Sequence, residues 1–171
     1  RMTLDEIVAE VVRIGTPLVE ITGGEPLAHP NVVPLAARLA DAGFTVLCET
    51  SGAFDVGVLD ARVHRIMDLK CPGSGEVERN RWENLPLLGP GDEIKFVVAD
   101  RTDYEWMRTV IAEHRLDERV REGSLRALLV SPVWSDLDLE GLAEWILEDR
   151  LPVRFQLQLH KLIWGAEATG V

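Results

Sequence analysis

Residues 18–27 read Leu-Val-Glu-Ile-Thr-Gly-Gly-Glu-Pro-Leu, a short apolar strand that runs directly into two glycines. Because glycine has no Cβ, the Gly23-Gly24 pair lets a ligand approach the main chain closely. Glu25 adds a negative charge beside these main-chain groups, and the set suits the zwitterionic head group of an amino acid. Gly-Gly and Glu-Pro also occur in plain tight turns, so this stretch by itself leaves both interpretations open.

The rest of the chain repeats the order of strand, loop and helix. We predict strands at 18–22, 44–48, 63–69, 93–99, 126–130 and 153–159, and helices at 4–14, 30–43, 103–114 and 137–147. Thr3 and Glu6 predict a capping box at the start of the first helix, and the polar residues 76–91 predict a helical turn and an irregular crossing. Apolar runs at 96–98 and 128–130 indicate strands buried on both faces, which is typical of a parallel sheet covered by helices. About six such units predict an α/β fold, an incomplete TIM-like βα barrel, because a full eight-fold barrel needs a longer chain.

The unusual residues of the sequence cluster where these strands end. They occupy 22–26, 49–52, 68–72 and 131–134. In a parallel βα barrel all these ends lie on one rim, and ligands bind there. Lys70 could reach a carboxylate at this rim or could be a solvated surface lysine. Glu49 could hold a ribose hydroxyl or a heterocycle amine, or it could act as a helix cap.

Length and composition restrict the class of protein. The 171 residues fit one domain, 1–171, and the net charge of −11 argues against a nucleic-acid partner, because phosphates need a basic face. No apolar stretch approaches the ~18 residues of a membrane span, and we expect a cytoplasmic protein. Cys48 and Cys71 show no metal-ligand spacing, so we interpret them as free thiols.

Several of these motifs resemble those of the radical S-adenosylmethionine (SAM) superfamily. Residues 22–27 resemble its GGEP motif, and 49–52 and 68–70 match the next two strand ends of that fold. The first and third of these motifs also occur in activases of glycyl-radical enzymes. Residues 158–165, Gln-Leu-His-Lys-Leu-Ile-Trp-Gly, with a chain end at Val171, are instead similar to the 7-carboxy-7-deazaguanine synthase family.

The resemblance implies a lyase of queuosine and 7-deazapurine biosynthesis. Such an enzyme contracts the ring of 6-carboxy-5,6,7,8-tetrahydropterin to 7-carboxy-7-deazaguanine and releases ammonia. The resemblance further implies SAM, a 4Fe-4S cluster and Mg²⁺ as cofactors. It also implies an external reductant such as a flavodoxin, and a homodimer.

The resemblance assigns roles to residues of this chain by position. The expected SAM-binding residues are Gly23, Gly24, Glu25, Glu49, Ser51, Lys70, Cys71, Pro72, Gly73, Ser131, Pro132, Val133 and Trp134. Within this set, Lys70 is the expected partner of the methionyl carboxylate. The expected substrate-binding residues are Thr22, His160 and Val171, although a lone histidine such as His160 also fits a structural role.

The chain departs from the family pattern at its start. The three cysteines that hold the family's cluster are expected upstream of the GGEP strand, and the sequence begins at Arg1, just before the helix that follows them. We therefore expect a shortened core domain without the cluster segment, with no catalytic residue and no metal ligand of its own, and inactive alone. Two alternatives remain, an activase of a glycyl-radical enzyme and a non-catalytic binding module of the same fold.

Overall fold

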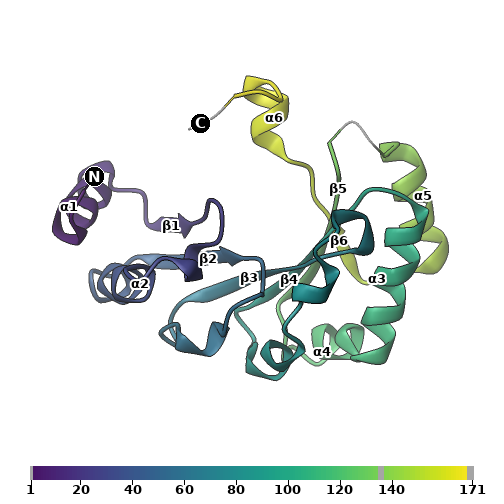
Figure 1. Ribbon diagram of the computed structural model, residues 1–171, viewed down its shortest axis with the longest axis horizontal. Helices are drawn as coiled ribbons and strands as arrows, with labels where there is room; N and C mark the ends of the chain where they lie inside the picture. The colour runs from purple at the N-terminus through teal and green to yellow at the C-terminus, as the bar shows by residue number, and fades with distance from the viewer. Residues whose placement is uncertain (1, 135–136, 169–171) are drawn as a thin grey trace.

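The computed structural model describes residues 2–134 and 137–168, and its six strands form one parallel sheet (Figure 1). The strands are β1 (Leu18–Ile21), β2 (Thr45–Thr50), β3 (His64–Leu69), β4 (Glu93–Val98), β5 (Ala127–Pro132) and β6 (Val153–Phe155). They lie side by side in chain order, and every neighbouring pair is parallel. This open parallel sheet of βα units is the predicted incomplete barrel.

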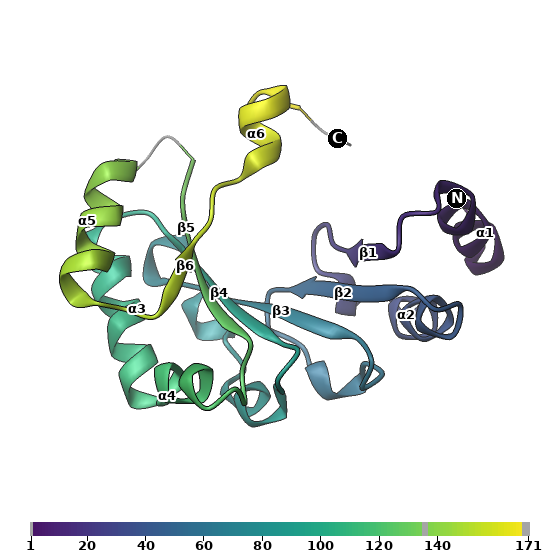
Figure 2. The same ribbon diagram turned by 180° about the vertical axis from the view of Figure 1, so that it is seen from behind.

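The helices are α1 (Leu4–Ile14), α2 (Val32–Asp41), α3 (Arg101–Glu113), α4 (Leu116–Arg121), α5 (Leu139–Asp149) and α6 (Leu159–Trp164). Figures 1 and 2 show α1 and α2 at the β1 end of the sheet and α3, α4 and α5 at the other end, with α6 rising above the sheet after β6. Short 3-10 turns, η4 (Val77–Arg79) and η5 (Trp82–Leu87), fill the crossing from β3 to β4. None of the described helices is both long and apolar enough to span a bilayer.

The first helix begins and ends where its sequence predicts. The hydroxyl of Thr3 accepts a hydrogen bond from the Glu6 N–H at 3.2 Å, and the Glu6 carboxylate accepts one from the Thr3 N–H at 2.7 Å. Together these bonds form the predicted capping box. Gly15 ends the helix at a φ of 75°, a left-handed conformation that glycine adopts without a steric penalty.

Several predicted boundaries are wrong by one or two residues, and the end of the last strand is wrong by four. Strands β2 and β5 each continue two residues further than predicted, so Thr50 and Pro132 end them. The last strand ends at Phe155 rather than at 159. Residues 159–164 form a helix, because Leu159, Leu162 and Ile163 stand at helical spacing instead of alternating. The six-residue helix α4 was not predicted, because it is mostly charged and too short to show a period.

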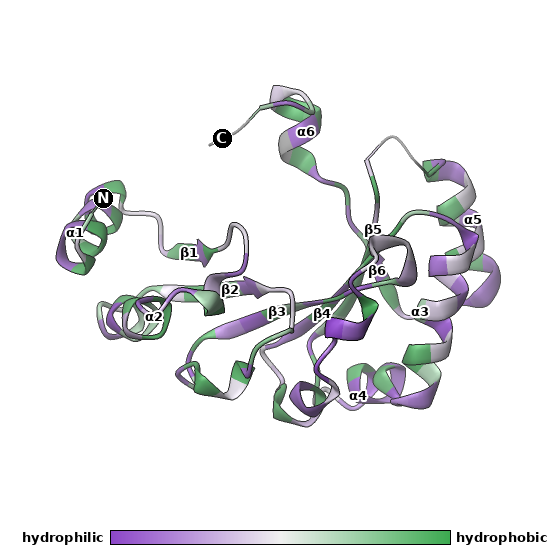
Figure 3. Ribbon diagram, viewed as in Figure 1, coloured by the Kyte–Doolittle hydropathy of each residue, from purple (hydrophilic) through white to green (hydrophobic). Residues whose placement is uncertain are grey.

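The pairing of the strands separates two faces of the sheet. Met67, Phe96 and Val130 lie on one face, which α2, α3 and α5 cover, and all three are fully buried. Successive side chains of a strand point to opposite faces. Glu49, Asp68 and Lys95 therefore share the other face, which we call the open face. The strands in Figure 3 accordingly show hydrophilic residues among hydrophobic ones.

The expectation that residues 96–98 are buried on both faces holds only in part. Phe96 and Val98 are fully buried under the helices, but Val97 points to the open face and is half-buried. In the neighbouring strand Leu129 is 6% exposed, so the run at 128–130 is buried throughout. The difference shows that helices cover one face of this sheet and that the other stays partly accessible.

Replacing Leu128 with alanine tests where the core lies. Its side chain is fully buried between β5 and the helices, so Leu128→Ala should lower the free energy of unfolding by about 2–5 kcal/mol. Leu147→Ala on α5 is the matched control, since Leu147 is 75% exposed and should change stability by no more than about 0.5 kcal/mol. Urea unfolding measures both values, and equal losses would contradict this placement of the core.

Candidate active site at the carboxyl ends of the strands

A cavity of about 360 Å³ lies on the open face, at the carboxyl ends of the strands. Residues of four strands (β1, β2, β4 and β5) and of the segment after β6 line it, namely Glu20, Glu49, Lys95, Ser131, Gln156, Leu157, Gln158 and Leu159. Two of the predicted SAM-binding residues, Glu49 and Ser131, thus face a common hollow. The predicted meeting of the strand ends at one rim is therefore confirmed for this part of the chain.

Opposite charges meet at the floor of this cavity. The ammonium of Lys95 donates a hydrogen bond to the Glu49 carboxylate at 2.6 Å, and both side chains are mostly buried. Burial raises the pKa of the nearby Glu20, the negative charge of Glu49 raises it further, and Lys95 lowers it in part. The three groups form an electrostatic cluster in which Glu20 holds a proton more readily than an ordinary glutamate does.

The sequence prediction missed Glu20 and Lys95, although the sequence contains a signal for both. Each charged residue stands between apolar residues, as Val19-Glu20-Ile21 and Ile94-Lys95-Phe96. In a strand covered on one face only, this alternation places the charge on the opposite face. Glu20 and Lys95 lie inside their strands, whereas the prediction considered only residues that follow strand ends.

A second pair of opposite charges lies at the end of β3. The Lys70 ammonium donates to Asp68 Oδ2 at 2.6 Å, and the Lys70 side chain is 30% exposed. The other carboxylate oxygen, Asp68 Oδ1, is buried and has no hydrogen-bond partner, and Gln158 Oε1 is in the same state. Because a buried unpaired acceptor is costly, these two oxygens fit a ligand that brings hydrogen-bond donors.

The glycines after β1 are open to a ligand. Gly23 and Gly24 adopt φ angles of +95° and +58°, which favour glycine, and a Cβ placed on either would meet no atom within 4 Å. Thr22, which precedes them, is exposed as well. Open space therefore surrounds this loop and leaves room for a ligand beside its main chain.

Glu25 is tied to the neighbouring strand end. Its carboxylate accepts hydrogen bonds from the Leu27 N–H at 2.9 Å and from the Thr50 hydroxyl at 2.8 Å. The N–H of Ser51 donates at 2.7 Å, and the Ser51 hydroxyl donates as well. Burial works to raise the pKa of Glu25, but the bonds from Ser51, Leu27 and Thr50 together lower it. The charge of Glu25 is thus engaged within the protein.

The third loop contributes less than predicted through its side chains. Cys71 is 1% exposed and packs in the hydrophobic core, so its thiol does not reach the rim. The N–H of Gly73 donates a hydrogen bond to the Asp103 carboxylate at 2.7 Å. A glycine is needed at position 73, because a Cβ there would lie only 2.6 Å from that carboxylate. Pro72 is half-buried, and Gly73 is exposed beside it.

Neither cysteine is placed to hold a cluster. Burial raises the pKa of both thiols, to about 11 for Cys48, and both lie among apolar side chains under the helices. A thiolate is the form that binds iron, so these surroundings oppose ligation. The described residues also contain no group of three or more His, Cys, Asp or Glu side chains placed to hold a metal ion.

The fourth predicted loop borders an apolar hollow of about 210 Å³. Pro132, Val133 and Trp134 line it together with Leu137, Leu139, Leu157, Gln158 and Leu162. The ammonium of Lys161 on α6 lies 5.8 Å from the centre of the Trp134 ring, which joins this loop to α6. His160 belongs to the backbone of α6. The side chain of His160 and the whole of Val171 lie outside the described residues.

No family model matches the chain, but its sequence is similar to those of known proteins. The chain is 43% identical over 185 residues to the 7-carboxy-7-deazaguanine synthase of Koribacter versatilis, which covers 100% of this chain and 80% of that protein. It is also 43% identical over 173 residues to the enzyme of that name from Chlorobaculum tepidum, with coverage of 99% and 76%. The chain belongs to the 7-carboxy-7-deazaguanine synthase family.

Solved structures agree with the fold of a 7-carboxy-7-deazaguanine synthase. QueE from Escherichia coli superposes with a TM-score of 0.64 at 24% identity, over 92% of this chain and 64% of that chain. Streptococcus suis SuiB bound to S-adenosylmethionine superposes with a TM-score of 0.56 at 13% identity, over 96% of this chain and 44% of that chain. At these identities the likeness shows the shared fold.

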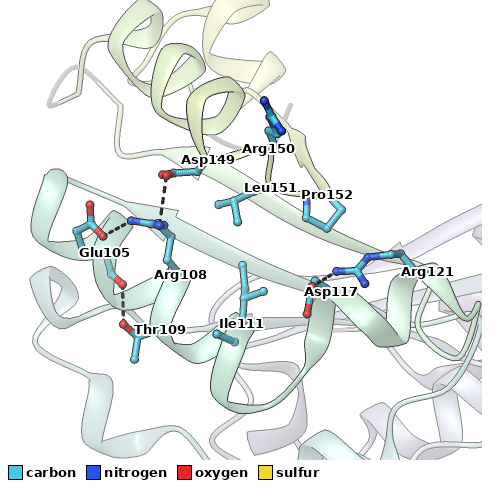
Figure 4. Close-up of a pocket in the computed structure, with 11 residues that line it drawn as sticks. Glu105, Arg108, Thr109, Ile111, Asp117, Arg121, Asp149, Arg150, Leu151 and Pro152 are labelled. Carbon is cyan, nitrogen blue, oxygen red and sulfur yellow. Dashed lines mark hydrogen bonds and ion pairs between the residues drawn. The ribbon is translucent and has the colours of Figure 1, made fainter.

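A larger cavity of this synthase chain, about 580 Å³, lies between α3, α4 and the turn from α5 to β6, away from the rim (Figure 4). Most of its charged side chains already pair with one another. Arg108 contacts Glu105 at 2.7 Å and Asp149 at 3.2 Å, and Arg121 pairs with Asp117. A charged ligand would have to break these pairs, so the rim is the better candidate for the active site of the synthase.

Neutralising Glu20 tests the charge cluster of the synthase rim. The pKa of Glu20 is higher in the folded than in the unfolded chain, so its negative charge destabilises the fold at pH values above that pKa. At low pH the carboxyl is protonated in both the folded and the unfolded chain, and the destabilisation disappears. Glu20→Gln should therefore raise the melting temperature at about pH 7.5, and the gain should shrink towards about pH 4.

Glu10→Gln is the matched control. The bond to Arg13 lowers the pKa of Glu10, so this substitution should leave the melting temperature unchanged or slightly lower at neutral pH. Differential scanning fluorimetry across the pH range measures both variants. A lower melting temperature of Glu20→Gln at about pH 7.5 would contradict the described cluster.

Proposed function

We propose that this chain forms the SAM-binding and substrate-binding core of a 7-carboxy-7-deazaguanine synthase, in one domain. The reaction is the ring contraction of 6-carboxy-5,6,7,8-tetrahydropterin to 7-carboxy-7-deazaguanine with release of ammonia. The observation that carries the proposal is the convergence of charged and unpaired polar groups on the open face, in a chain of this family. A SAM molecule and a pterin both bring the hydrogen-bond donors that these groups lack.

The pair of Asp68 and Lys70 suits the amino-acid end of SAM. The partly exposed Lys70 ammonium would bind the methionyl carboxylate, and the unpaired Asp68 Oδ1 would accept from the methionyl ammonium. The carbonyl groups of Gly23 and Gly24, on a loop with open space beside it, would bind the same ammonium. Both charges of a zwitterion would thus have a partner of opposite sign within a few ångströms. A simple anion would be attracted by Lys70 but repelled by the negative charge of Asp68.

The other end of SAM suits the far side of the rim. Adenine is flat and mostly apolar, and the hollow beside Pro132, Val133 and Trp134 offers apolar walls. The unpaired Gln158 Oε1 would accept from its amino group, and Glu49 would accept from ribose hydroxyls. We further propose Ser51 and Ser131 as neighbours of the nucleoside, with the loop of Cys71, Pro72 and Gly73 contacting it through the main chain.

The 4Fe-4S cluster does not fit the described residues. When bound, such a cluster supplies the electron that cleaves SAM, and both described thiols are buried away from the rim. We propose no step through the cluster with residues of this part of the chain. The three cluster cysteines expected upstream of β1 remain a prediction from family resemblance.

The substrate would enter the open face beside Glu20, Glu49 and Lys95. Thr22 stands exposed at the mouth and is our proposed contact, with His160 and Val171 as further contacts predicted by resemblance. Mg²⁺ prefers oxygen ligands and would suit the carboxylate of the pterin. An external reductant such as a flavodoxin and a homodimeric assembly complete the proposal.

Binding of a pterin separates this proposal from its alternatives. The fluorescent compound 6-carboxypterin should bind the chain in the presence of SAM, with a rise in fluorescence anisotropy. An activase of a glycyl-radical enzyme would bind SAM and leave the pterin free. A non-catalytic module of the same fold would be indicated if neither compound binds, and that result would contradict the proposed function.

Removing the charge of Lys70 tests the proposed SAM site. Lys70→Met should weaken SAM binding about tenfold or more in isothermal titration calorimetry, because a hydrogen bond to a charged group contributes roughly 1.5–3 kcal/mol. Arg121→Met is the control, since Arg121 lies on α4 at the cavity of Figure 4 and should leave SAM affinity unchanged. Equal affinities of the wild type and Lys70→Met would contradict the assignment of Lys70.

A further inference from the structure

The crossing from β3 to β4 places two buried asparagines against the rim loops. Asn80 follows η4 and is 7% exposed, and Asn84 lies in η5 and is 0% exposed. Each side chain bonds to the backbone of a different loop. The sequence of this crossing predicted only a helical turn and irregular structure, so neither asparagine was singled out.

Asn80 bonds to both main-chain groups of Lys70. The Lys70 N–H donates to Asn80 Oδ1 at 2.9 Å, and Asn80 Nδ2 donates to the Lys70 carbonyl at 2.9 Å. Inside a sheet, a neighbouring strand forms such hydrogen bonds to the N–H and carbonyl groups of a residue. Lys70, however, lies one residue beyond the end of β3. The amide of Asn80 thus fixes the backbone of Lys70 where the sheet no longer does.

Fixing this backbone also fixes the direction of the side chain. Asp68 and Lys70 are two residues apart along an extended chain, so they point to the same face. Their side chains meet at 2.6 Å on the open face. A rotation of the Lys70 peptide would turn its side chain away from Asp68 and from the mouth, and the two bonds from Asn80 oppose that rotation.

We propose that Asn80 is a positioning residue of the SAM site, which holds Lys70 so that its ammonium meets the carboxylate of the ligand. The inference rests on the proposed function, because it assumes that Lys70 binds SAM. Asn80 itself touches no ligand in this account. Its contribution to affinity passes entirely through Lys70.

Asn84 provides a matched comparison from the same crossing. Its Nδ2 donates to the carbonyls of Gly52 at 2.9 Å and Phe54 at 2.7 Å, and its Oδ1 accepts from the Val56 N–H at 3.2 Å. It is as buried as Asn80 and also holds a rim loop, but its hydrogen bonds all go to the loop after β2. A general effect of losing a buried asparagine should therefore appear in both variants.

A double-mutant cycle tests the inference. SAM dissociation constants are measured by calorimetry for Asn80→Ala and Asn84→Ala, each with Lys70 intact and with Lys70→Met. We expect Asn80→Ala to weaken binding by roughly threefold to tenfold when Lys70 is intact and by nothing further in Lys70→Met. Asn84→Ala should change the affinity by the same factor in both backgrounds.

The outcomes separate the inference from the proposed function. If Asn80→Ala has no effect, or an equal effect in both backgrounds, Asn80 does not act through Lys70 and the inference is overturned. If Lys70→Met itself leaves affinity unchanged, the assignment of Lys70 fails, and the inference fails with it. Thermal unfolding verifies that each variant folds. If Asn80→Ala does not fold, Asn80→Asp, which keeps the acceptor and loses the donor, replaces it in the cycle.

Discussion

Helices cover one face of a parallel sheet in this chain, and the rest of the structure depends on that asymmetry. Because side chains alternate along each strand, the residues under the helices form the core, and every second residue faces the open side. Phe96 and Lys95 are neighbours in sequence, yet one is fully buried in the core and the other bonds to Glu49 in the cavity. The same strands thus supply stability and a charged site.

The open face tolerates its charges because they are paired. Lys95 lies against Glu49 and Lys70 against Asp68, so two cations offset two of the buried anions. The acceptors that stay unpaired, Asp68 Oδ1 and Gln158 Oε1, lie in the part of the fold where the strand ends meet. The protein itself supplies no hydrogen-bond donor to these two oxygens. A ligand with an ammonium or amino group would supply the missing donors.

The sequence predicted the parallel α/β fold, the capping box of α1 and the positions of the rim loops, because these follow from local periodicity and turn chemistry. It did not predict Glu20 and Lys95, whose importance depends on which face of a strand the helices cover. It also did not predict the engagement of Glu25 by Ser51 or of Lys70 by Asn80, because the first contact joins residues 26 apart and the second depends on an irregular crossing.

Hydrogen exchange of the chain with and without SAM tests the central claim, that the ligand binds at the carboxyl ends of the strands on the open face. We expect slower amide exchange on SAM binding at residues 22–25, 51–52, 70–71 and 133–134, because a bound ligand suppresses local opening. Slower exchange confined to residues 105–121, beside the cavity between α3 and α4, would contradict it.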